Sequence, residues 1–280
     1  MTTTATSDST AVPGSPAGPA PTRAATGRPA AQRIPLTRLV AVEARKSFDT
    51  RAGFWLLASI GIVSVLATGA VILWAPESEL TYATFSTAVG FPMAVILPMI
   101  AILSVTAEWS QRNGLTTFTL VPHRGRTILA KGVVAVGVGV VSMLVAMVVG
   151  AAGNVAGTAL AGTDPVWNSS AADLSMIVVG NVLGLMVGFM LGVVVRGSAG
   201  AIVAYFVYSL VLPPISGVLA FNQEWFRDLQ PWVDFRYAQG ALFEGLPSAE
   251  QWQQIAASGA LWLVLPLAVG LRILLRSEVK

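Results

Sequence analysis

The chain has 280 residues, of which 54% are hydrophobic and 11% are charged, and its mean hydropathy is +0.70. A soluble domain carries about 25% charged residues, so this composition excludes a single water-soluble core and predicts an integral membrane protein with several spans. The net charge of +3 fits basic loops beside a membrane better than nucleic-acid binding, and the absence of cysteine with a single histidine, His123, argues against thiol or metal chemistry.

Residues 1–33 are rich in Thr, Ala, Pro, Gly and Ser and contain few apolar side chains. Such a segment buries too little surface to offset the entropy of ordering, so we expect a disordered tail. It lacks the apolar centre of a signal peptide. The membrane domain is therefore predicted to be residues 34–280.

Residues 36–49 predict an amphipathic helix on the cytoplasmic membrane surface. Its apolar stripe consists of Leu36, Leu39, Val40, Ala44 and Phe48. Glu43 falls within this stripe, which is costly unless the carboxylate is paired. Two partners are open: Lys46, which we favour, or an arginine of the 108–131 stretch.

Six apolar segments follow, and each is close to the length of about 20 residues that a helix needs to cross a bilayer. They do not alternate in polarity, and backbone groups in lipid must be satisfied internally, so all six are predicted to be helices of an all-α fold. The segments are 54–74, 87–107, 128–150, 174–195, 199–220 and 256–275.

The basic residues predict the orientation of these spans. Fifteen of the 17 Lys and Arg residues fall before the first span, after the last, or in alternate loops on the same side. The positive-inside rule then places both termini in the cytoplasm of a multi-pass plasma-membrane protein.

The fourth span carries four glycines spaced four residues apart, which line one helix face and permit close helix packing. They are Gly180, Gly184, Gly188 and Gly192. This face serves either packing within the subunit, which we expect, or a sliding or dimer surface.

The spans hold no acidic residue near the middle of the membrane and no recognisable catalytic constellation. This argues against a self-powered carrier and against an enzyme. Loop 221–255 carries eight aromatic residues among charges, which favours short helices in the outer interface.

The stretch from Glu108 to Lys131 is the most distinctive polar segment between two spans. Glu108 and Arg112 are four residues apart and can pair on a helix face. An uncharged segment, Leu115–Leu120, follows the Asn113–Gly114 turn, and Pro122 precedes a basic turn. Positive-inside anchoring explains the arginines but leaves the apolar segment unexplained, so we expect it to contact a protein or the membrane interface.

This pattern resembles the permease subunits of type-2 ABC exporters, which handle drugs and polysaccharides. The resemblance rests on Glu108-Trp109-Ser110-Gln111-Arg112, on Gly114-Leu115-Thr116-Thr117-Phe118-Thr119-Leu120, and on Pro122-His123-Arg124-Gly125-Arg126 with Lys131. The N-terminal surface helix and the aromatic loop before the last span are also similar, so the resemblance extends over about residues 36–280.

The resemblance implies a permease that dimerises with a second copy or a paralogue and docks a separate ABC ATPase on its cytoplasmic loop. No Gly-x-x-x-x-Gly-Lys-Ser/Thr motif is present, so ATP would enter only through the partner. The implied coupling residues are Glu108, Arg112, Leu115, Thr116, Phe118, Pro122, Arg124 and Arg126, supported by Glu43 and Lys46. Two other functions stay open: a non-transporting membrane anchor or sensor subunit, and a lipid-modifying membrane enzyme.

Overall fold

The structure, a computed structural model, describes residues 35–49, 51–110 and 124–276. The predicted tail 1–33 lies outside the described residues. The part that is described is helical almost throughout and contains no strand, apart from an isolated pairing of Thr81 with Val166. The prediction of an all-α fold is confirmed.

The first half of the described chain forms four long helices that follow a shorter N-terminal one. These elements are α1 (Leu36–Asp49), α2 (Arg51–Trp74), the 3-10 turn η1 (Glu77–Glu79), α3 (Tyr82–Ser110), α5 (Arg124–Ala161) and α6 (Ala171–Val195). The second half is more broken. Its elements are α7 (Ser198–Phe206), η2 (Val207–Val211), α8 (Leu212–Asn222), α9 (Glu224–Val233), α10 (Phe235–Glu244), α11 (Ala249–Gly259), η3 (Ala260–Val264) and α12 (Leu265–Arg276).

Six of the described helical stretches are long and apolar enough to cross a membrane. Each overlaps one of the six predicted spans, and together they indicate a multi-pass membrane protein. The fifth is the continuous stretch from α7 to α8, and the sixth runs from α11 to α12.

The third span is much longer than the predicted 128–150, because α5 continues to Ala161. Three glycines on one side of this extension, Gly150, Gly153 and Gly157, lie against the ring or backbone of Phe85, which is fully buried. The glycines leave room for the Phe85 side chain to pack against α5. This packing stabilises residues 151–161 as a continuation of the helix, where the sequence predicts a loop.

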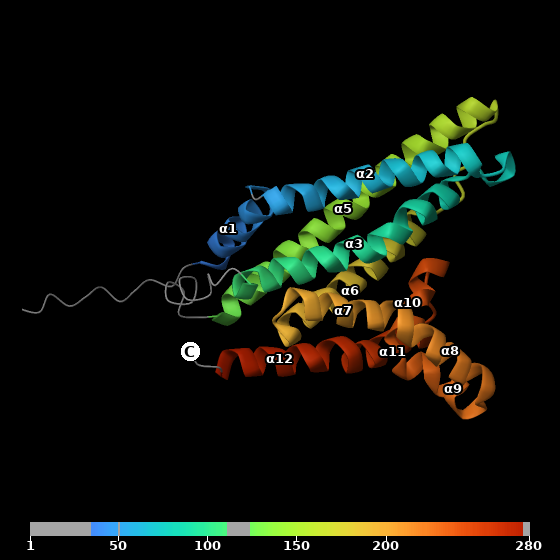
Figure 1. Ribbon diagram of the computed structural model, residues 1–280. Helices are drawn as coiled ribbons and strands as arrows, with labels where there is room; N and C mark the ends of the chain where they lie inside the picture. Colours follow the sequence, from blue (N-terminus) through green and yellow to red (C-terminus); the bar gives the residue numbers. More distant parts are fainter. Residues whose placement is uncertain (1–34, 50, 111–123, 277–280) are drawn as a thin grey trace, which may run out of the picture. The chain divides into compact units, whose positions relative to one another are not determined.

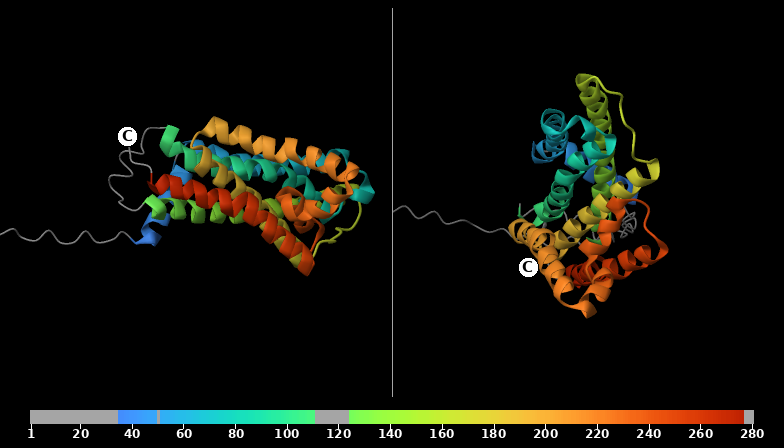
Figure 2. Two further views of the ribbon diagram at one scale, coloured as in Figure 1. Left: turned by 90° about the horizontal axis from the view of Figure 1, so that it is seen from below. Right: turned by 90° about the vertical axis from the view of Figure 1, so that its right-hand side faces the viewer.

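The helix ends gather in two groups, which Figures 1 and 2 show from three directions. Helix α1, the end of α3, the start of α5 and the end of α12 lie at one end of the bundle. Turn η1, the end of α5 and α9 lie at the other. The short connections between consecutive long helices, such as the two residues from α6 to α7, impose this alternation.

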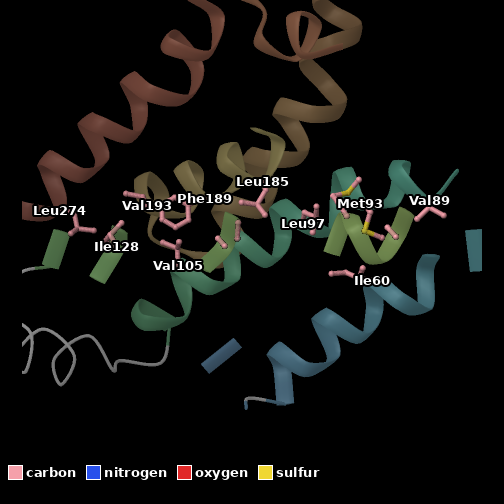
Figure 3. Packing of buried hydrophobic residues seen from close by; sticks show 14 residues of the cluster. Ile60, Val89, Met93, Leu97, Val105, Ile128, Leu185, Phe189, Val193 and Leu274 are labelled. Carbon is pink, nitrogen blue, oxygen red and sulfur yellow. The ribbon is translucent and has the colours of Figure 1, made fainter. Parts of the chain in front are cut away.

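The hydrophobic core is centred on α6, which packs against α3, α5, α7, α10 and α12. Leu185, Phe189 and Val193 of α6 are buried together with Leu97 and Val105 of α3 (Figure 3). The buried residues of α3 and those of α6 recur at helical spacing, so they form one face of each helix. These two faces pack against each other, although both helices are apolar throughout.

The last two spans each contain a π-helical turn just before a proline. Turn η2 precedes Pro213 and Pro214, and turn η3 precedes Pro266. Proline has no N–H to donate and its ring collides with the carbonyl four residues earlier. A wider turn accommodates this collision without ending the helix.

The aromatic loop contains short helices, as expected, but α10 does not lie loosely on the surface. Phe235 and Leu242 of α10 are buried, and the ring of Phe235 lies against Gly259 at the end of α11. Trp225 of α9 is exposed. One side of α10 therefore belongs to the core, while Tyr237 and Phe243 of the same helix are exposed.

Candidate functional site at the junction of α1, α3 and α5

A buried lysine joins three helices at the end of the bundle where α3 stops and α5 starts. Lys131 lies about two turns into α5 and its Nζ is 2.7 Å from Oε2 of Glu43 on α1. The same Nζ donates to the carbonyl oxygen of Ser104 on α3 at 3.2 Å. Both ionised side chains are buried, with 6% of Lys131 and 9% of Glu43 exposed.

Glu43 uses both carboxylate oxygens in ion pairs. Its Oε1 accepts a hydrogen bond from Nζ of Lys46 at 2.7 Å, and the Lys46 side chain is half exposed. Helix α1, which carries Glu43, packs against α2 and α5, so the side of α1 that bears Glu43 faces protein. A carboxylate inside an apolar stripe is tolerated here because two ammonium groups replace the water it has lost.

The charge environment favours the ionised form of Glu43. Burial alone raises the pKa of this carboxyl, but the adjacent Lys131, by charge and hydrogen bond, and then Lys46 together hold the pKa below its ordinary value of 4.5. The junction is therefore an ionic contact at neutral pH, and it carries one more positive than negative group.

The predicted coupling residues surround this junction in the chain. Glu108 lies in the last turn of α3 and Arg124 is the first residue of α5, while Arg126 is half-buried in the first turn of α5. Arg112, Leu115, Thr116, Phe118 and Pro122 lie outside the described residues. The Glu108–Arg112 pair therefore stays a prediction.

The structure contains the favoured Glu43–Lys46 pair and also joins Glu43 to the 108–131 stretch, through Lys131. Our candidate residues omitted Lys131. The signal was present: a lysine within an apolar span and a glutamate within an apolar stripe each need a partner. Distance along the chain concealed the pairing, because 88 positions separate the two residues.

The four glycines that recur every fourth residue along α6 face other helices of the same chain. Gly180 and Gly184 lie beside Phe243 and Gln239 of α10. A Cβ at Gly188 would lie 2.6 Å from the carbonyl oxygen of Pro98, and one at Gly192 would lie 3.2 Å from Val105. The row thus admits α10 near one end of α6 and α3 near the other.

A second connection to α3 comes from α7. The hydroxyl of Tyr205 donates to the carbonyl oxygen of Ala94 at 2.6 Å. That carbonyl stands four residues before Pro98, which has no N–H to offer it. Further toward the end of α3, Thr106 and Ser198 share a hydrogen bond of 2.8 Å between their hydroxyl oxygens. Helices α3 and α7 are therefore linked at two levels.

No protein-family model matches the sequence, and no curated protein matches it. The fold and composition define the chain as a multi-pass membrane protein with six candidate membrane-crossing helices among the described residues. The junction at Lys131 is its most polar buried contact between distant described segments.

Proposed function

We propose that the chain is the permease subunit of an ABC exporter in the plasma membrane, working as a dimer and driven by a separate ATPase subunit. The observation that carries the proposal is the Lys131 junction. It ties together the two helices that flank loop 111–123 and fastens both to α1. A force applied to that loop would reach three helices at once.

In this proposal the ATPase docks on the loop between α3 and α5. Glu108, Arg112 and the segment around Phe118 form the contact, with Arg124 and Arg126 at its border. The Glu43–Lys131 ion pair carries α1 along with α5. The hydrogen bonds of Tyr205 and Thr106 pass the movement of α3 to α7, and so to the fifth span.

The charge difference between the two ends of the bundle supports the proposed orientation, with loop 111–123 in the cytoplasm. The end that bears the loop carries most of the described basic residues: Arg38, Arg45, Lys46, Arg51, Arg126, Lys131, Arg196, Arg272 and Arg276. The other end carries most of the described acids: Glu77, Glu79, Asp164, Asp173, Glu224, Asp228, Asp234, Glu244 and Glu250.

Co-purification tests the proposal. The tagged chain is isolated from native membranes in mild detergent, and associated proteins and ATP hydrolysis are measured. We expect a nucleotide-binding subunit in the wild-type sample, and we expect Glu108→Lys and Arg112→Glu each to lower its recovery. Arg272→Glu on α12 is the matched control, since it reverses a charge at the same end outside the loop.

An ATPase recovered equally with all four proteins would contradict the role of Glu108 and Arg112. An ATPase recovered with none of them would contradict the permease assignment. ATP-dependent transport in vesicles then separates a permease from a non-transporting anchor.

A further inference from the structure

The side of α1 that faces away from the bundle is basic. Arg38 and Arg45 are exposed and seven residues apart, so they lie on one helix face. Val42 lies between them with 47% of its surface exposed, and Lys46 borders them with half of its side chain exposed. Asp49, at the end of the helix, is the one acid on this face. We call Arg38, Val42, Arg45 and Lys46 the basic face of α1.

The basic side chains of this face outnumber its acids, because Arg38, Arg45 and Lys46 share it with Asp49 alone among the described residues. Glu43, the other acid of α1, is buried beside this face and is neutralised by Lys131 and Lys46. Neither Arg38 nor Arg45 forms an ion pair with a described residue. The ion pair thus fixes the orientation of α1 so that two arginines project away from the protein.

The basic face of α1 lies close to the membrane surface, because α1 directly precedes the first candidate span. Helix α1 ends at Asp49, and the first candidate span begins at Gly53. Phe54 and Trp55, both more than half exposed, open that span with rings 5.8 Å apart. Tryptophan is enriched at the level of lipid headgroups because its ring is amphipathic, which favours that level for Trp55. The basic face belongs to the helix that leads directly into this span, and its nearest member, Lys46, lies nine residues before Trp55.

We propose that the basic face of α1 binds the headgroups of anionic phospholipids. Two guanidinium groups match phosphate oxygens in charge and geometry, and Val42 between them contacts the boundary with the acyl chains. Juxtamembrane basic residues attract anionic lipid strongly, by about fivefold each. The headgroups supply the ionic partners that Arg38 and Arg45 do not have among the described residues.

The test uses the absence of cysteine from the sequence. The full chain with Val42→Cys is labelled with bimane and placed in phosphatidylcholine nanodiscs without any ATPase. Either brominated phosphatidylglycerol or brominated phosphatidylcholine is added at the same mole fraction, and the quenching of bimane is compared. We expect phosphatidylglycerol to be enriched beside the label by about fivefold or more.

In the same background, Arg38→Gln with Arg45→Gln should bring quenching by the two lipids close to equality. Arg272→Gln with Arg276→Gln on α12 is the matched control and should keep the preference. Raising the salt concentration should weaken the preference, because exposed charges are screened. A thermal unfolding curve of each variant shows that the fold is kept.

Equal quenching by the two lipids in the labelled parent overturns the proposal. A preference that survives the loss of both arginines also overturns it. Because no ATPase is present, neither result depends on the permease assignment.

Discussion

Lys131 is the residue on which the geometry at the end of the bundle depends. It neutralises Glu43 and also donates to the Ser104 carbonyl, so its loss removes contacts to two helices. Removing one partner of a buried ion pair costs far more than the pair itself is worth, because the other charge is left without compensation.

We expect Lys131→Met to lower the free energy of unfolding by about 3 kcal/mol. Lys46→Met should cost less than about 1 kcal/mol, because the Lys46 side chain is half exposed and its pair is of the surface kind. Unfolding in mixed micelles measures both.

Replacing both charges, as in Glu43→Leu with Lys131→Met, should recover most of the loss, since an apolar pair needs no neutralisation. Equal costs for the two lysines, or no recovery in the double variant, would contradict the assigned role of Lys131.

The same pair makes the docking of α1 sensitive to acid. The folded pKa of Glu43 is below its ordinary value of 4.5. Its stabilising contribution is therefore complete above about pH 4.5 and is lost as the pH falls through the folded pKa. We expect the wild type to lose more stability than Glu43→Gln between about pH 5 and pH 3. Parallel losses in both proteins would show that another group titrates.

At the scale of elements, the contact between α3 and α6 depends on the missing side chain at Gly188. A Cβ there would meet the backbone of Pro98, which cannot rotate away. Gly188→Ala should therefore force the helices apart and destabilise the protein by about 1–3 kcal/mol. Gly137→Ala on α5 is the control, because no described atom outside its own helix turn lies within 4 Å of the position that the alanine methyl would occupy; it should be neutral or slightly stabilising. A neutral Gly188→Ala would contradict the close packing.

One of the two links between α3 and α7 depends on the Tyr205 hydroxyl. Tyr205→Phe leaves the Ala94 carbonyl without the donor that replaces the N–H missing at Pro98. We expect a loss of about 1 kcal/mol. Tyr208→Phe is the matched control, because the buried Tyr208 hydroxyl has no hydrogen-bond partner among the described residues. Thermal unfolding should rank the two variants clearly, and the reverse order would contradict the link.

For the whole molecule, hydropathy and length are sufficient to predict the six spans, because a helix needs about 20 apolar residues to cross a bilayer. The extension of α5 was not predictable in this way. It depends on Phe85 meeting Gly150, Gly153 and Gly157, a match between distant segments that hydropathy does not encode.

In the candidate site, too, one contact is predictable from local sequence and others depend on how the helices pack. Local spacing was enough to predict the Glu43–Lys46 pair, since three residues along a helix bring side chains together. Lys131 and the Tyr205–Ala94 bond depend on which helices become neighbours. The sequence indicates that a buried lysine and a carbonyl before a proline each need a partner. Which residue is the partner follows only from the packing of α1 on α5 and of α7 on α3.

Photo-crosslinking in native membranes tests whether an ATPase subunit docks between α3 and α5, as we propose. A photoreactive amino acid is placed at Thr117 in the loop, or at Glu79 of η1 at the opposite end of the bundle as the control. We expect position 117 to capture a protein with a nucleotide-binding phosphate loop and position 79 to capture none. Capture of no such protein at Thr117, or equal capture from both positions, would contradict it.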